Sequence, residues 1–229
     1  MKDYSVLERN LGYSFQDKKL LAHALTHSSY ASEHDLAYSE NNERLEFIGD
    51  AYLDAIIGNK LYEVMPNQPE GVLSKTRANI VCERSLATIA RNIGLGDFLF
   101  LGNGEEMYGG REKDSLLADA VEAIIGAIIR ESGYDCADRV VLKLFEENIL
   151  LALQGKLYHD YKTALQEMLQ ERYKNVRIQY EPVSESGPDH RKVFTVQVKV
   201  DDAVLATGSG HSKKAAEQEA ARKVLMKGV

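Results

Sequence analysis

The sequence predicts a two-domain protein: an all-α domain over residues 1–152, a linker at 153–159 and a small α+β domain over residues 160–229. Helical spacing of apolar residues fills the first part, and strand-like alternation begins only near residue 176. The charge divides at the same place. The chain holds 28 basic and 35 acidic residues, or −7; residues 157–229 hold 12 and 10, or +2, which leaves −9 for residues 1–156. This asymmetry suggests two separate tasks.

The composition is that of a folded protein without a membrane span. Hydrophobic residues make up 44% and charged residues 28% of the chain, which excludes wholesale disorder. There is no run of about 18 apolar residues, and the first residues lack the apolar core of a secretory signal. Cys82 and Cys136 lie far apart and form no metal-binding pattern. A reducing, cytoplasmic location is therefore the simplest expectation.

Five segments of the first domain carry apolar residues at helical spacing. Pro66 and Pro69 mark one loop, and four glycines between residues 102 and 110 mark another. The segment 116–129 is apolar on all sides, which predicts a buried central helix. The predicted helices cover residues 20–25, 42–62, 74–93, 116–129 and 135–153.

The second domain follows the order α-β-β-β-α. Asp160 can cap its first helix, and Ser212 opens its last one. Between them, branched and aromatic residues alternate with polar ones in three segments that are separated by turn residues. The predicted strands lie within residues 176–180, 194–200 and 204–206. This order within about 70 residues predicts a compact α+β fold.

A row of four acids marks the helix predicted at 42–62. Glu43, Glu46, Asp50 and Asp54 are spaced by 3, 4 and 4 residues, so they fall within an arc of about 80° on a helix. Like charges one turn apart repel each other. This helix alone leaves two interpretations open: a solvated acidic face, or one side of a cation site.

Two further acids interrupt the apolar helix at 116–129. Asp119 and Glu122 are three residues apart and share one face. An ionised carboxylate is costly to bury unless it is paired, hydrogen-bonded or bound to a cation. Three explanations remain open: an ion pair with an arginine such as Arg77 or Arg84, protonated neutral acids, or a bound cation.

The cation hypothesis requires the two acidic faces to meet. Glu46, Asp50, Asp119 and Glu122 would then surround a divalent metal. Carboxylate oxygens suit Mg²⁺ or Mn²⁺, and zinc is less suited because no His or Cys stands at a ligand spacing. Carboxylate-bound Mg²⁺ is typical of enzymes that act on phosphate esters.

The motifs around these acids resemble a known family. Residues 42–51, Asn-Glu-Arg-Leu-Glu-Phe-Ile-Gly-Asp-Ala, closely resemble the signature of ribonuclease III, the Mg²⁺-dependent endonuclease of double-stranded RNA. The C-terminal part resembles the double-stranded RNA-binding domain that usually follows the all-α endonuclease domain. Further blocks that resemble the family lie at 24–29, 70–78, 102–105, 109–111 and 117–123.

The resemblance implies roles for the acids. Glu46, Asp50, Asp119 and Glu122 match the family's catalytic, metal-binding acids, and Asp50 and Glu122 match the two that are treated as essential for cleavage. It further implies Mg²⁺, with Mn²⁺ as a substitute, and products with 5′-phosphate and 3′-hydroxyl ends. Outside the four, Glu70 matches a supporting acid, Glu43 a supporting acid at the dimer interface, and Phe47 an aromatic residue that packs into the partner of a homodimer, whereas Asp54 lies outside the family set.

The resemblance also implies where RNA is held. Ser212, Lys213 and Lys214 match the family's phosphate-binding helix start, where a helix N-terminus itself attracts phosphate. Such domains recognise the A-form shape of the duplex, largely without sequence preference. The positions that match the two minor-groove contacts are Thr163, Gln166 and Glu167 on the first helix and Pro188 and His190 in the loop between the first two strands.

Two functions from different classes follow from these patterns. The first is a Mg²⁺-dependent endoribonuclease that processes ribosomal RNA precursors and other structured RNAs, as the resemblance implies, with no organic cofactor and no membrane partner. The second is a double-stranded RNA-binding protein without catalysis on the same scaffold. All four catalytic acids are present, which favours the endonuclease.

Overall fold

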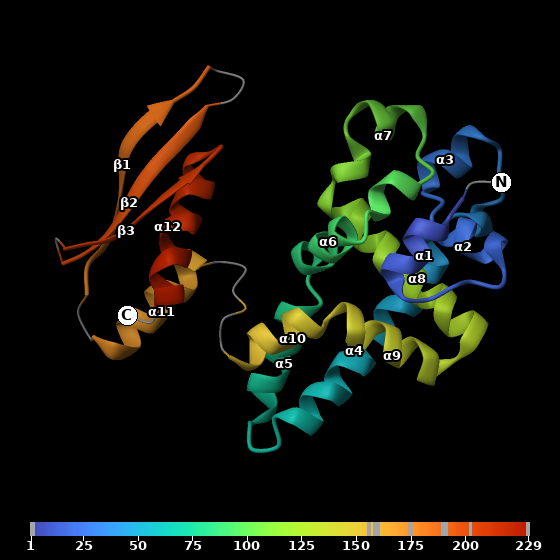
Figure 1. The fold of residues 1–229 in the computed structure, drawn as a ribbon, viewed down its shortest axis with the longest axis horizontal. Coiled ribbons are helices and arrows are strands. Elements are labelled where there is room, and N and C mark those ends of the chain that lie inside the picture. The colour runs from blue at the N-terminus through green and yellow to red at the C-terminus, as the bar shows by residue number, and fades with distance from the viewer. Residues whose placement is uncertain are drawn as a thin grey trace. The chain divides into compact units, whose positions relative to one another are not determined.

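The computed structural model describes residues 3–154, 157, 161–173, 176–188, 192–201 and 203–227. The chain forms two compact units, Met1–Gln154 and Gly155–Val229 (Figure 1). Most of the predicted linker at 153–159, and the predicted cap Asp160, fall outside the described residues, so both stay predictions. No helix among the described residues is long and apolar enough to cross a membrane.

The first unit is helical, as predicted. In the described residues its α-helices are joined by short 3₁₀ turns at Tyr38–Glu40, Leu95–Phe98 and Gly110–Glu112. The α-helices are α1 Ser5–Leu11, α2 Lys18–Ala24, α3 Ser28–Glu33, α4 Glu43–Val64, α5 Glu70–Ile80, α6 Glu83–Asn92, α7 Asn103–Met107, α8 Asp114–Ser132, α9 Tyr134–Leu144 and α10 Glu146–Leu153.

The helix α8 lies at the centre of this unit and packs against α2, α4, α6 and α9. Its apolar residues are buried around its whole circumference, which confirms the prediction made from the segment 116–129. A helix without a polar side must be surrounded by others. The helix α8 is therefore held firmly in place, and acids on the helices that pack against it can be positioned relative to it.

Two glycines allow α4 and α8 to cross at very short range. A Cβ atom on Gly49 would lie 1.8 Å from the carbonyl oxygen of Glu122, and one on Gly126 would lie 2.1 Å from that of Leu45. No side chain fits at either position. The crossing therefore depends on glycine in both helices, and it brings the acidic segment of α4 against that of α8.

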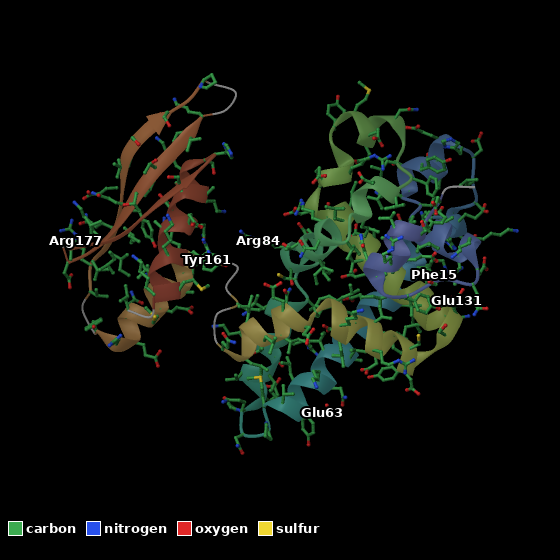
Figure 2. The ribbon with its side chains drawn as sticks, viewed as in Figure 1. Phe15, Glu63, Arg84, Glu131, Tyr161 and Arg177 are labelled. Atoms are coloured by element: carbon green, nitrogen blue, oxygen red, sulfur yellow. The ribbon has the colours of Figure 1, made fainter. Side chains whose placement is uncertain are left out.

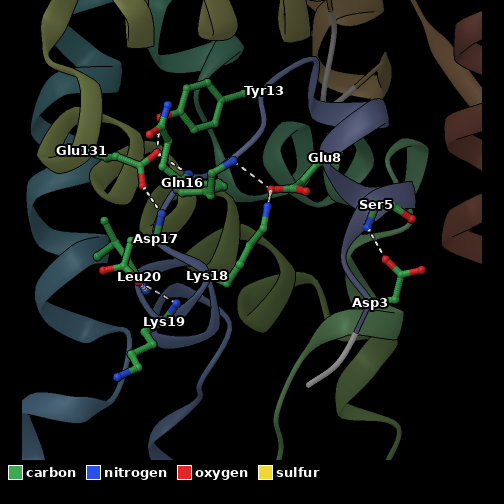
Figure 3. Close-up of polar contacts among 11 residues, drawn as sticks. Asp3, Ser5, Glu8, Tyr13, Gln16, Asp17, Lys18, Lys19, Leu20 and Glu131 are labelled. Atoms are coloured by element: carbon green, nitrogen blue, oxygen red, sulfur yellow. Dashed lines mark hydrogen bonds and ion pairs between the residues drawn. The ribbon is translucent and has the colours of Figure 1, made fainter.

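Glutamates tie the N-terminal segment to the helical unit (Figures 2 and 3). Glu131 at the end of α8 accepts hydrogen bonds from the Tyr13 hydroxyl and from the backbone N–H of Asp17 at 2.8 Å. Burial alone would raise the pKa of Glu131, but these hydrogen bonds outweigh it and hold the pKa below its usual value. Within the segment itself, Glu8 of α1 accepts a hydrogen bond from the N–H of Phe15 at 2.8 Å.

Some boundaries differ from the prediction. The helix predicted at 74–93 is two helices, because Cys82 has an extended backbone with φ −68° and ψ 156°. The segment 135–153 is also divided, at the fully buried Phe145. The glycine-rich loop contains the short helix α7. Apolar periodicity continues through both breaks, which is why it does not reveal them.

The second unit has the predicted order of one helix, three strands and one helix. Its elements are α11 Tyr161–Arg172, β1 Ile178–Ser186, β2 Val193–Val200, β3 Ala203–Gly210 and α12 Lys213–Lys227. The strands form an antiparallel sheet in the order β1-β2-β3, with both helices on one face (Figure 1). Residues such as Leu165, Val198 and Val224 form the core between helices and sheet.

Candidate active site

Three carboxylates meet where α4 crosses α8. One oxygen each of Glu46, Asp119 and Glu122 lies within 4.8 Å of the other two. Glu46 comes from the first turns of α4, and the other two come from successive turns of α8. All three side chains are partly buried. The two acidic faces therefore converge, as the cation hypothesis requires.

The environment of this group disfavours negative charge. Burial, followed by repulsion from Asp50, Glu46 and Asp119, raises the pKa of Glu122 to about 8. Burial also raises the pKa of Glu46 and of Asp119 above the usual values. A group of acids with raised pKa values binds either protons or a cation.

Asp50 stands beside this group without joining it. Its side chain is exposed, one helical turn after Glu46, and it is not among the three carboxylates that lie within 4.8 Å of one another. Its charge nevertheless raises the pKa of both Glu46 and Glu122. The structure thus brings three of the four predicted ligands together and leaves the fourth at the rim.

The two alternatives to a cation can now be compared with the contacts. None of the four acids forms an ion pair with a lysine or arginine in the part of the chain that the structure describes. Arg77 pairs instead with Asp54, at 3.6 Å. A protonated Glu122 agrees with its raised pKa in the absence of a cation. An all-oxygen donor set fits a hard divalent cation, and the residues present therefore fit a metal of this kind.

His27 is a neighbour of the site that sequence analysis did not single out. Its side chain caps α3 by accepting a hydrogen bond from the N–H of Ser29 at 3.2 Å. Burial lowers its pKa, while Glu105 and Asp119 act in the opposite direction. The imidazole therefore interacts electrostatically with Asp119, one of the three acids. A histidine that caps a helix gives no periodic signal in the sequence.

The residues predicted to support the site do not belong to the group of three carboxylates. Glu43 accepts a hydrogen bond from the Tyr38 hydroxyl at 2.6 Å, and its charge raises the pKa of Glu46. Glu70 is exposed at the start of α5 and accepts a bond from Ser74 at 2.6 Å. Phe47 is 76% exposed. Their roles stay predictions.

The residues expected to contact RNA lie on the surface of the second unit. Thr163, Gln166 and Glu167 are exposed on α11, and Pro188 is exposed after β1. The Ser212 hydroxyl caps α12 by accepting a bond from the N–H of Ala215 at 3.1 Å. Lys213 and Lys214 follow it and are exposed. His190 lies outside the described residues.

Comparison with known proteins identifies the family. A family model described as "Ribonuclease-III-like" matches residues 17–172, and one described as "Double-stranded RNA binding motif" matches residues 161–227. The chain belongs to the ribonuclease III family. It is 51% identical over 221 residues to "Ribonuclease 3" of Caldanaerobacter subterraneus, with 96% of each chain covered. It is 48% identical to "Ribonuclease 3" of Sulfurovum sp., with 97% of this chain and 96% of the relative covered.

A solved structure agrees with this assignment. The nuclease domain of ribonuclease III from Campylobacter jejuni matches with a TM-score of 0.60 and 48% identity, over 65% of this chain and 99% of that one. That structure is described for flexibility in the region involved in dimer formation. As a member of the ribonuclease III family, the protein is an endoribonuclease that acts on double-stranded RNA, and the family implies a divalent metal.

Proposed function

We propose that this ribonuclease III enzyme uses Mg²⁺, held by Glu46, Asp50, Asp119 and Glu122, to cut both strands of duplex RNA. Cleavage would leave 5′-phosphate and 3′-hydroxyl ends. The observation that carries this proposal is the group of three carboxylates at the crossing of α4 and α8. Mn²⁺ has the same preference for oxygen ligands and is expected to substitute.

Each acid has a distinct task in this proposal. Glu46, Asp119 and Glu122 hold the cation from two rigid helices. Asp50 completes the ligand set from the exposed edge of the site. Glu122 must release its proton before it can bind a metal, because its pKa is raised to about 8. When bound, the cation neutralises charge on the phosphate and lowers the pKa of water.

The acids also make the approach of RNA to the helical unit depend on the cation. An acidic surface repels the phosphates of a duplex until positive charge neutralises it. The second unit attracts RNA without a cation. Lys213 and Lys214 supply positive charge at the start of α12, where Ser212 caps the helix. The minor-groove contacts are assigned to Thr163, Gln166, Glu167, Pro188 and His190. We expect duplex binding to survive without a divalent cation, while cleavage does not.

The test is cleavage of a long RNA duplex with Mg²⁺, with Mn²⁺ and in EDTA. The variant Glu122→Gln should cut at least about a hundredfold more slowly, because even indirect supports of a metal site are worth 10- to 100-fold, and it should still bind the duplex. The matched control is Glu63→Gln. This glutamate lies on α4, and its exposed side chain accepts a hydrogen bond from Asn59 (Figure 2). The control should cut like the wild type.

The second candidate function, a duplex-binding protein without catalysis, gives a different outcome. Wild-type protein would then bind the duplex in EDTA and in Mg²⁺ alike, and no product would form with either metal. Equal cleavage by Glu122→Gln and wild type would instead contradict the site while leaving the nuclease assignment intact.

A homodimer through the helical unit completes the proposal. Two features support it: Phe47 is 76% exposed, and it borders a hollow of about 620 Å³ that is also lined by Tyr38, Glu43, Ile48 and Arg130. An exposed aromatic ring beside a hollow suits a two-fold contact in which each copy fills the other. Phe47→Ala should shift the protein towards monomer in analytical ultracentrifugation, and an unchanged dimer would contradict this interface.

A cytoplasmic location is part of the same proposal. Cys82 and Cys136 form no disulfide in the described part of the chain, which suits the reducing cytoplasm. Precursors of ribosomal RNA and other structured transcripts are the expected substrates there.

A further inference from the structure

Two lysines gather around one carboxylate at one end of the sheet in the second unit. The Glu185 carboxylate lies 2.9 Å from Lys192 Nζ and 3.6 Å from Lys213 Nζ. Both ammonium groups also stand over the ring of Phe194, at 5.8 and 5.9 Å from its centroid. Two cations and one anion share this place, so it keeps a net positive charge.

The strand register explains why these residues meet. Glu185 on β1 pairs with Phe194 on β2, and Phe194 pairs with Gly210 on β3. Directly paired residues carry their side chains on the same face of a sheet. A Cβ on Gly210 would meet Ala215 of α12, so this face is the one that the helices cover. Lys213, in the first turn of α12, therefore lies beside the cross-strand row of Glu185, Phe194 and Gly210.

The place is suited to a phosphate group. It adjoins the N-terminus of α12, which carries partial positive charge. Lys213 and Lys192 approach it from different elements, one from the helix and one from the residue before β2. The Glu185 carboxylate now pairs with both ammonium groups through its oxygens, and its negative charge opposes that of a phosphate.

We infer that Lys192 is a further phosphate contact for duplex RNA and that Glu185 is an exchangeable counter-ion which limits RNA affinity. The inference rests on the RNA-contacting role proposed above for the start of α12. In the free protein Glu185 neutralises part of the charge of both lysines. On binding, a phosphate takes over these contacts.

The exchange requires little free energy. Glu185 and Lys213 are exposed, and ion pairs between exposed groups contribute little to stability. The Phe194 ring keeps both ammonium groups nearby through cation–π attraction, whether or not the carboxylate is present. Loss of the carboxylate therefore leaves the lysines near their place and increases the local positive charge.

A matched ion pair elsewhere in the sheet provides the control. Glu181 lies 2.6 Å from Lys199 Nζ. Lys199 directly follows the buried Val198, so it points to the opposite face, away from the helices. Lys199 lies five positions after Phe194, or roughly 17 Å along an extended strand. The two pairs have the same chemistry, and only one of them borders α12.

The experiment measures binding of the full chain to a fluorescent RNA duplex of about 22 base pairs, longer than the ~16 that such a domain covers. EDTA prevents cleavage, and salt is varied. Lys192→Gln should weaken binding about three- to tenfold near physiological salt and reduce the slope of log affinity against log salt by about one. Glu185→Gln should strengthen binding about threefold. Glu181→Gln and Lys199→Gln should each change affinity by less than about twofold.

Two results would overturn the inference. If Lys192→Gln and Lys199→Gln weaken binding equally, Lys192 acts only through the net charge of the domain. If Glu185→Gln weakens binding, the carboxylate positions the lysines and does not compete with phosphate. Circular dichroism melting of each variant establishes that a loss of binding does not arise from unfolding.

A further pair of variants separates this inference from the proposal on which it rests. Lys213→Gln and Lys214→Gln should both weaken duplex binding. If neither does, RNA is not held at the start of α12, and the proposed contact surface fails. If both do while Lys192→Gln binds like the wild type, only the present inference fails.

Discussion

The candidate sites of the two units differ in how their charges are paired. In the helical unit, Glu46, Asp119 and Glu122 gather with no lysine or arginine paired to any of them among the described residues. In the second unit, acids lie beside bases: Glu185 beside Lys192 and Lys213, and Glu181 beside Lys199. A site for a cation must keep its own positive charges away. A surface for phosphate can keep its lysines paired with carboxylates until RNA arrives.

The difference also appears in the direction of the pKa values. Burial raises the pKa of Glu122 to about 8, whereas hydrogen bonds from Lys192 lower the pKa of Glu185. Glu46, Asp119 and Glu122 thus lack partners for their negative charge among the described residues in the absence of a cation, whereas Glu185 and Glu181 have theirs in the absence of RNA. The first arrangement lowers stability in exchange for function.

The largest test of this comparison concerns glycines that hold each unit together. A Cβ on Gly49 would lie 1.8 Å from the Glu122 carbonyl oxygen, and one on Gly208 would lie 2.2 Å from Ala220 N. Each Gly→Ala change should lower the stability of its own unit by about 2–4 kcal/mol, because backbone must move apart. Gly49→Ala should also abolish cleavage, while Gly208→Ala should leave some Mg²⁺-dependent cleavage at low salt. Thermal unfolding and cleavage assays measure both.

Gly104 provides the control for these substitutions. A Cβ there meets nothing within 4 Å, and Gly104→Ala in the short helix α7 should melt like the wild type. If Gly49→Ala keeps full cleavage, the close crossing of α4 and α8 is not what positions the acids. If Gly208→Ala abolishes cleavage at every salt concentration, the helical unit does not act by itself.

A smaller effect tests how the unfavourable charge of Glu122 changes stability with pH. The pKa of Glu122 is raised in the folded state, so between about pH 4.5 and 8 the unfolded chain releases a proton that the folded chain retains. Stability in EDTA should therefore fall as pH rises through this range. Glu122→Gln should reduce this slope, although Glu46 and Asp119 still contribute to it. It should also stabilise the helical unit at pH 8 by about 1–2 kcal/mol, a value discounted for partial exposure.

Melting temperatures at pH 5 and pH 8 decide this prediction. Wild type and Glu122→Gln should melt together at pH 5 and separate at pH 8, and added Mg²⁺ should raise the wild-type value more than that of the variant. A wild type that is as stable as the variant at pH 8 in EDTA would contradict an unsatisfied acid at this position.

Sequence patterns predicted the fold class because each helix repeats its apolar face every three to four residues, and each strand alternates. They also marked the carboxylates, since acids such as Asp119 and Glu122 interrupt an otherwise apolar helix. They did not reveal the glycine crossing at Gly49 and Gly126, because that contact joins segments distant in the chain. The break at Cys82 stayed hidden because the apolar spacing continues across it.

The smallest expected effect concerns Asp54, whose angle on the helix suggests a place in the site but whose contacts do not. Asp54 falls on the same stripe as Asp50 by angle, but it pairs with Arg77 of α5 at 3.6 Å. Exposed pairs of this kind contribute at most about 1 kcal/mol. Asp54→Asn should therefore change cleavage by less than about threefold, whereas Asp50→Asn, at the rim of the acidic group, should reduce it at least about tenfold. Steady-state cleavage of one duplex by both variants measures the two losses of rate. Equal losses would mean that the whole row of acids on α4, with Asp54 included, forms the site.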